Sequence, residues 1–413
     1  MGGNNSSEVR VGLSGLIRQQ PYPRLGNLVD EISPVGHWTI WDAEKHPDWP
    51  RSKQVLAIAR RHPEKKVHNA GPASNYEDDK KLRAVRAESN LRLFLSTHVN
   101  AVKMDGSRIE SVITQDIRTG KRTRFRAHLF ADCTGDGNLG FLAGAEFRQG
   151  RESRAETHEE LAPSAADELV MGTSVQWNSV LDTTASTFPE CPWAVRFDAT
   201  TCIEATRGDW NWETGAARDQ VREIEQIRDY ALRIVFGNWS VLKNHPKYRA
   251  KFANRRLNWV AYIGGKRESR RLLGDVILEQ QDIVGRRHFA DASVTATWTI
   301  DLHYPQKPKC ACDAFQSTAR QLKITPYAIP YRCFYSRNID NLFMAGRDIS
   351  VTHVALGTVR VQRTTGMMGE VVGMAAAICG KQTCDPRRVY EHHLEELKDL
   401  MRAGVPPGPS LTK

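Results

Sequence analysis

The stretch AHLFADCTGDGNLGFLAGAEF, residues 127–147, constrains the fold more than any other part of the chain. It predicts a buried strand ending at Asp132, a turn containing Gly135 and Gly137, and a helix that carries small residues. Such a unit offers bare backbone N–H groups and a helix N-terminus, which suit a phosphate or a ring system. Taken alone, it is equally compatible with a packed turn that binds no ligand.

A second stretch, residues 341–379, predicts the same order of elements. A short buried strand is expected over 342–345, a turn that exposes Asp348 over 346–348, a second turn at Gly357, and a helix over about 360–379. Three glycines share one face of that helix because they recur at spacings of three and four: Gly366, Gly369 and Gly373. Each glycine destabilises a helix by about 1 kcal/mol relative to alanine. Three of them on one face therefore indicate close contact, either with a flat ligand or with a neighbouring element.

The rest of the chain divides into regions that differ in residue composition and in apolar spacing. Residues 91–132 predict an antiparallel meander of strands joined by turns at Asp105-Gly106 and Thr119-Gly120. Residues 150–325 hold seven of the ten tryptophans, and apolar residues at helical spacing predict a helix over 219–243. These tryptophans suit either a buried core or a carbohydrate-binding wall. The tail at 405–413 is expected to be frayed.

Composition limits the possible compartments and cofactors. The chain of 413 residues has no apolar run near the roughly 18 residues of a membrane helix, so no membrane insertion is expected. No secretory signal is visible, and eight scattered cysteines favour free thiols in a reducing, cytoplasmic compartment. Cys310 and Cys312 form the only close pair, which does not support a metal site or an iron-sulfur cluster.

The net charge of +10 raises the question of a nucleic-acid partner. The basic residues alternate with acids, as in GKRESRRLLGD, and they lack the interleaved aromatics that stack bases. No nucleic-acid partner is therefore expected. The arginines suit local ion pairs, or the capture of an anionic substrate or a cofactor phosphate.

The two glycine-bearing stretches, together with WETG, AYIGGKRESRRLLGD, TWTIDLHYP and the segment from IPYRCFYSRNIDNLFMAGRD onward, resemble the FAD-dependent oxidoreductases that fold like glutathione reductase. They are most similar to a bacterial branch of that family. The resemblance implies an α/β fold: an FAD/NAD(P)-binding Rossmann-like domain with an inserted α+β substrate domain. In the family, a loop like GGNNSSE follows a strand, a G-x-G-x-x-G turn, a helix and a second strand, so we expect the Rossmann-like domain to be incomplete at its N-terminus.

The same resemblance implies a cofactor, FAD, and residues that contact it. Gly2, Gly3, Ser6 and Ser7 match the loop that passes the dinucleotide, and Val99 matches the strand that meets the adenine. Further matches fall in the two glycine-bearing stretches: Thr134, Gly135, Asp136, Gly346, Asp348, Gly357, Thr358 and Gly366. Distant relatives pass electrons through iron-sulfur clusters, which the cysteine spacing here does not support.

The substrate side is expected in the middle of the chain. Oxidation of an alcohol or amine by hydride transfer needs a base, for which His353 is the first candidate and His303, beside Asp301, the second. Arg267, Arg270 and Arg271 surround Glu268 in a segment expected to open a helix, where they suit either a substrate carboxylate or an internal ion-pair cluster.

These expectations define four segments: 1–148, first part of the FAD-binding domain, with the meander at 91–132; 149–325, substrate domain; 326–380, closing part of the FAD-binding domain; and 381–413, C-terminal helix and tail. The predicted function is oxidation or reduction of a small sugar-like or acid-like molecule by FAD, with an unidentified electron acceptor. Two alternatives stay open: a truncated, inactive fragment, and an electron-transfer subunit of a heterodisulfide-reductase-like complex.

Overall fold

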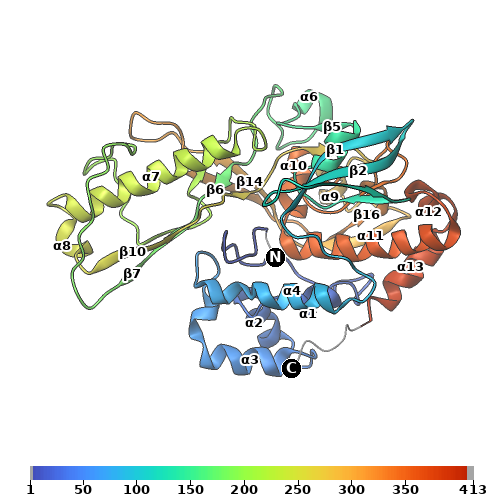
Figure 1. The fold of residues 1–413 in the computed structure, drawn as a ribbon, viewed down its shortest axis with the longest axis horizontal. Coiled ribbons are helices and arrows are strands. Elements are labelled where there is room, and N and C mark those ends of the chain that lie inside the picture. Colours follow the sequence, from blue (N-terminus) through green and yellow to red (C-terminus); the bar gives the residue numbers. More distant parts are fainter. Residues whose placement is uncertain (1–2, 407–413) are drawn as a thin grey trace.

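The computed structural model describes residues 3–406 and has two lobes (Figure 1). One lobe is built around a long helix, α7 (Ile224–Asn244), and the other around a second long helix, α11 (Gln362–Gln382). The N-terminal loop lies where the two lobes meet, and the first helices run beneath α11. Segments far apart in the sequence therefore share the junction between the lobes.

Short helices follow the N-terminal loop. They are α1 (Asn27–Ile32), α2 (His37–Lys45), α3 (Ser52–Arg61), the 3-10 turns η1 (Pro63–Lys66) and η2 (Ala73–Tyr76), and α4 (Asp78–Ala87). A small apolar core, separate from the main one, joins α2 to α3 through Val35, Ile40, Ala43, Val55 and Ala59. This part of the chain is helical where the sequence analysis predicted only a loop at its start.

The meander comes next, with strands β1 (Thr97–Asp105), β2 (Arg108–Asp116) and β3 (Arg122–Arg126) in one antiparallel sheet. Its first strand begins at Thr97, so residues 91–96 precede it. The expected last strand is divided in two, because β4 (Phe130–Asp132) leaves the meander and pairs in parallel with β17 (Leu342–Met344). This parallel pair brings the two glycine-bearing stretches together.

The lobe around α7 has the most irregular structure. Its elements are β6 (Thr173–Ser174), β7 (Trp177–Leu181), β8 (Arg207–Gly208), β9 (Glu213–Thr214), α8 (Arg249–Phe252), β10 (Arg255–Val260) and β11 (Gly265–Lys266), and β14 (Ile300–Pro305) pairs with β15 (Ser317–Leu322) where the lobes meet. Five elements from the same part of the sequence belong to the larger lobe and its main core: β5 (Phe147–Arg148), α6 (Arg154–Thr157), β12 (Arg271–Leu272), α9 (Gln280–Val284) and β13 (Ala292–Ala296). Helix α7 agrees with the helix predicted over 219–243. Trp177, Trp212 and Trp239 form a buried cluster beside it. These three tryptophans therefore belong to a core and not to a carbohydrate-binding wall.

The chain then returns to the larger lobe and closes it. Its elements are β16 (Tyr327–Pro330), η3 (Tyr331–Cys333), β17, α10 (His353–Val359), α11, α12 (Pro386–His392) and α13 (Leu394–Ala403). The predicted strand at 342–345 and the helix after residue 360 are both present. The predicted turn at Gly357 is wrong, because Gly357 lies inside α10, whose seven residues are all buried and whose first turn is capped by the Thr352 side chain.

Three further findings concern cysteines, metal sites and membranes. The expectation of free thiols is wrong for one pair, since a disulfide joins Cys310 to Cys312, while the six other cysteines are free. Within residues 3–406 we find no group of three or more His, Cys, Asp or Glu side chains placed to hold a metal ion. No described helix is both long and apolar enough to cross a membrane.

Candidate functional site

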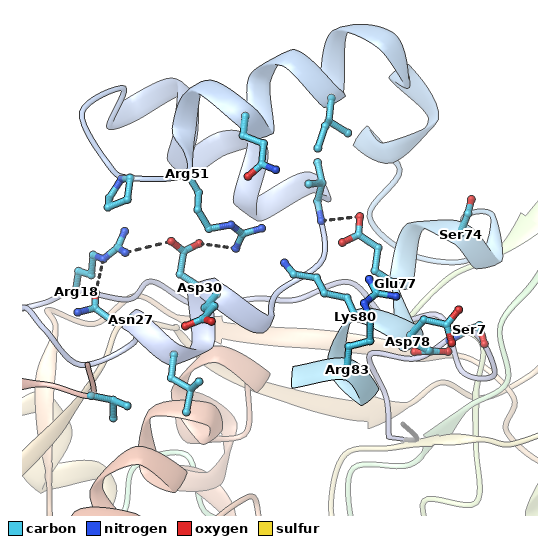
Figure 2. A pocket seen from close by; sticks show the side chains of 18 of the residues that line it. Ser7, Arg18, Asn27, Asp30, Arg51, Ser74, Glu77, Asp78, Lys80 and Arg83 are labelled. Atoms are coloured by element: carbon cyan, nitrogen blue, oxygen red, sulfur yellow. Dashed lines mark hydrogen bonds and ion pairs between the residues drawn. The ribbon is translucent and has the colours of Figure 1, made fainter. Parts of the chain in front are cut away.

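Two cavities differ in size and in the origin of their walls. The larger has a volume of about 940 Å³ and lies among α1, α3 and α4, with Val405 and Pro406 at its edge (Figure 2). The smaller has a volume of about 320 Å³ and lies between the lobes, where the N-terminal loop, β14, β15 and the start of α11 meet. Small-molecule sites occupy cavities of roughly 300–1,000 Å³, so size does not decide between them.

The ion pairs at the larger cavity join residues that are close in the sequence. Asp30 accepts hydrogen bonds from Arg18 at 3.1 Å and from Arg51 at 3.2 Å, as Figure 2 shows. Glu77 accepts from the backbone of Val35 and pairs with Lys65. These ion pairs all lie within one continuous part of the chain, residues 18–77.

The smaller cavity draws its walls from distant segments. Its polar and aromatic lining residues are Asn4, Ser14, His68, Asn69, Ser174, Gln176, Trp210, Lys266, Arg267, Trp298, Asp301, His303, Gln321, Arg347, Arg360 and Gln362. Successive side chains of a strand point to opposite faces, which places Asp301 and His303 on the same face of β14. The neighbouring strand β15 adds Ala319, which pairs directly with His303.

His303 is the one lining residue whose ring contacts two carboxylates. Its Nδ1 lies 2.8 Å from Oε2 of Glu213, and its Nε2 lies 3.3 Å from Oδ2 of Asp301. Glu213 does not line the cavity, whereas Asp301, the partner of Nε2, does. The Trp210 ring lies edge-on to the imidazole at 5.1 Å between ring centroids. Glu213 thus holds the orientation of a ring whose other nitrogen contacts a carboxylate of the cavity lining.

Both of these carboxyl groups are held in their charged form. Burial alone would raise the pKa of Glu213, but Arg267 and the hydrogen bond from His303 outweigh it and lower the pKa to about 2. Burial opposes ionisation of Asp301 in the same way, and the contacts with His303 and Arg360 lower its pKa well below the usual value. A negative charge therefore lies at each end of the imidazole at neutral pH.

Four cations line this cavity: Lys266, Arg267, Arg347 and Arg360. Lys266 and Arg347 share one buried partner, Asp136. Arg267 pairs with Glu213 at 3.2 Å, and Arg360 pairs with Asp301 at 3.0 Å. Sequence reasoning proposed Arg267 but missed the other three, because each reaches the cavity only through contacts with residues far away in the sequence.

His353, the first candidate for a catalytic base, lies elsewhere. It is buried at the start of α10, its Nδ1 lies 2.9 Å from Oε2 of Glu268, and it lines neither cavity. Arg271 joins the same network, since it is fully buried and donates to Glu268 and, at 2.8 Å, to Glu152. The ion-pair alternative therefore describes Arg271, and the backbone there forms short strands instead of the expected helix.

Arg270 is also directed inward. It donates to the side chain of Asn138 at 3.1 Å, and its guanidinium lies 4.0 Å from the centroid of the Phe141 ring. Only 4% of its surface is exposed, and it lines neither cavity. Of the three arginines expected to bind substrate, Arg267 alone reaches a cavity.

Asp348 is the expected cofactor residue with the clearest sign of a missing partner. The prediction that the turn exposes this acid is wrong, because Asp348, just after β17, is fully buried, and neither carboxyl oxygen has a hydrogen-bond partner. Burial, together with the nearby charge of Asp132, raises its pKa well above the usual value. The adjacent Gly346 has φ of +142°, and a Cβ there would lie 2.7 Å from Oδ1 of Asp348. These residues fit a ligand that brings hydroxyl donors to the end of β17.

The turn after β4 is occupied by protein contacts. Thr134 is exposed and donates to Asp132 at 2.7 Å, and Gly135 has φ of +70° beside Arg347. Asp136 is buried, where Ser269 donates to it at 2.9 Å in addition to its two cations. Asp136 is therefore placed to orient two of the cations that line the smaller cavity.

The remaining cofactor candidates are spread over the N-terminal loop, β1, α10 and α11. Gly2 lies outside the described residues, Gly3 is exposed with φ of +92°, and Ser6 is buried with an unpartnered hydroxyl. Ser7 lines the larger cavity, while Val99 sits in β1 against the main core. Thr358 lies inside α10 and Gly366 inside α11, where a Cβ would meet Val29 of α1 at 2.7 Å. The helix start that reaches a cavity is thus Val361–Gln362 and not residues 357–358.

Comparison with known proteins gives one match. A family model described as FAD dependent oxidoreductase matches residues 60–401, which include β4, β17, both long helices and most of the lining of the smaller cavity. No curated protein and no solved structure matches the chain.

Proposed function

The chain belongs to the family of FAD dependent oxidoreductases, and from that premise we propose that it oxidises or reduces a small organic substrate held in the cavity between the lobes. The observation that carries the proposal is His303, a buried imidazole that lines the cavity and lies between the carboxylates of Glu213 and Asp301. Catalytic groups of this kind occur in concave sites with strongly shifted carboxyl pKa values, as at Glu213.

FAD, when bound, supplies the acceptor or donor of a hydride. We assign its binding to Asp348 and the adjacent Gly346, because the unpartnered carboxyl group of Asp348 suits a hydroxyl-bearing chain. The start of α11 adds a partial positive charge, because the N–H groups at the first turn of a 21-residue helix have no partner within the helix. That charge favours negative charge on whatever ring lies there.

His303 is the group that exchanges a proton with the substrate in this proposal. Its Nδ1–H is donated to Glu213, so in the oxidation step an unprotonated Nε2 contacts the substrate hydroxyl or amine in place of Asp301 and takes its proton while the adjacent C–H bond loses hydride. Asp301, at 3.3 Å from Nε2, stabilises the positive charge that the ring then carries. Trp210 and Trp298 line the same space and limit the access of water to it.

A matched pair of histidine variants tests the assignment. In the presence of added FAD, anaerobic reduction of the flavin is followed by absorbance with lactate, malate, mandelate and glycerol as probes. His303→Gln is expected to slow reduction by about 100-fold or more while FAD binding stays unchanged. His353→Gln is expected to slow it far less, because His353 contacts Glu268 and not the cavity. Equal rates in wild type and His303→Gln would contradict the proposal, as would reduction by none of the probes.

A further inference from the structure

The charges that face the smaller cavity differ from those that lie behind its wall. Four cations line it, but of their three carboxylate partners only Asp301 does; Asp136 and Glu213 lie behind the lining. A small molecule in this space therefore meets positive charge on several sides and a single carboxylate. The set as a whole has four cations and three acids, so it is not neutral even when every pair is formed.

Arg360 is the cation with unused donors. One of its terminal nitrogens donates to Asp301, both to the backbone oxygen and to Oδ2, at 3.0 Å. Its Nε is buried and has no hydrogen-bond partner. The side chain as a whole is 12% exposed, so little water reaches it. Arginine presents donors in a planar fork that matches a carboxylate, and Arg360 lines the cavity, so an anion that reached this guanidinium would give it further acceptors.

The other walls indicate what the anion is attached to. Trp210 and Trp298 both line the cavity, and Nε1 of Trp298 also lacks a partner. The volume of about 320 Å³ is at the lower end of the range for small-molecule sites. Flat apolar rings beside a cationic wall suit a compact molecule with one anionic end and one apolar or hydroxylated end.

We propose that the substrate class is a small organic carboxylate, anchored by Arg360 with its body between the tryptophans and His303. This inference rests on the proposed function, because it names the substrate of the same site. It selects the acid-like over the sugar-like alternative, since a neutral sugar would leave the cationic lining unsatisfied.

Binding is tested without turnover. Quenching of tryptophan fluorescence is titrated with acetate, lactate, malate and mandelate, each beside its neutral amide, and with inorganic phosphate. At least one carboxylate is expected to bind at least ten-fold more tightly than its own amide and more tightly than phosphate. Equal affinity for every acid and its amide, or a preference for phosphate, would overturn the carboxylate assignment.

Two arginine variants locate the binding. Arg360→Met is expected to weaken carboxylate binding at least ten-fold. Arg320→Met is the control, because Arg320 is exposed on β15, where alternation directs it away from the face that carries Ala319 and Gln321. It is expected to change affinity less than two-fold. The same loss in both variants would overturn the proposal.

A second variant guards against misfolding of Arg360→Met, which leaves Asp301 without that partner. The double change Arg360→Met with Asp301→Asn removes both charges, and its affinity is expected to stay at least ten-fold below wild type. Recovery of wild-type affinity would overturn the anchoring role. Carboxylate binding without any flavin reduction would contradict only the proposed function. His303-dependent reduction by glycerol, without carboxylate binding, would overturn only the substrate class.

Discussion

The two cavities differ in how their charges are arranged, and this difference matters more than their volumes. In the larger one, Asp30 is held between Arg18 and Arg51, and all three belong to the first part of the chain. In the smaller one, the contact between Glu213 and His303 joins residues 90 positions apart, and that between Asp136 and Arg347 joins residues 211 apart. The smaller cavity gathers reactive groups from both lobes, whereas the larger separates neighbouring helices.

The largest expected difference concerns the ion pairs. Arg267→Met is expected to lower the free energy of unfolding by about 3–5 kcal/mol, because it leaves the buried carboxylate of Glu213 without its cation. Arg51→Met in the larger cavity is expected to cost at most about 1 kcal/mol, since Arg51 is 21% exposed and Asp30 keeps Arg18. Urea denaturation measures both. Equal costs would remove the distinction drawn between the cavities.

The pH dependence of stability is expected to have a different origin in each cavity. The pKa of Glu213 is lowered to about 2, so the stability it contributes is complete above the unfolded value near 4.3 and is lost as pH falls toward 2. Burial lowers the pKa of Lys80, in the larger cavity, to about 8, so the unfolded chain binds more protons than the folded one from pH 8 to about 10.4, and stability rises across that range. Thermal unfolding of Glu213→Gln should show a loss in acid that is weaker by about 3 kcal/mol, and Lys80→Met a weaker alkaline rise. Unchanged pH profiles would contradict these assignments.

The smallest expected effect concerns α11, which reaches both regions. Gly373→Ala is expected to stabilise the protein by about 0.5–1 kcal/mol, because a Cβ there has nothing within 4 Å. Gly366→Ala is expected to destabilise it by about 1 kcal/mol, because the added methyl would press on Val29 of α1, the helix that borders the larger cavity. Melting temperatures compare the two. A higher melting temperature in both variants would show that α1 is not packed rigidly against α11.

The sequence predicted the elements that depend on local pattern. The apolar spacing along α7 and the small residues along α11 were sufficient to place both helices. It failed at Gly357, where burial of the whole of α10 overrides the low helix propensity of glycine. It also missed α1 to α4, although α3 alternates apolar and basic residues at helical spacing.

The candidate site could be predicted only in part. Asp301 and His303 are two residues apart, so a strand there places them on one face, and that alternation was a usable signal for ranking His303 above His353. Glu213 and Arg360 carried no such signal, because their roles arise from long-range packing between the lobes. The four lining cations could not be told from surface arginines and lysines by residue type alone.

The proposed oxidation or reduction of the substrate takes place in the smaller cavity. Ala319 lines the smaller cavity and pairs with His303 on the neighbouring strand, whereas Ala73 lines the larger cavity. A phenylalanine at either position therefore fills one cavity and leaves the other open. The decisive measurement is the rate of flavin reduction by a small hydroxycarboxylate in Ala319→Phe and Ala73→Phe. We expect at least a 100-fold loss in Ala319→Phe and a change below two-fold in Ala73→Phe. The reverse ranking would contradict the claim.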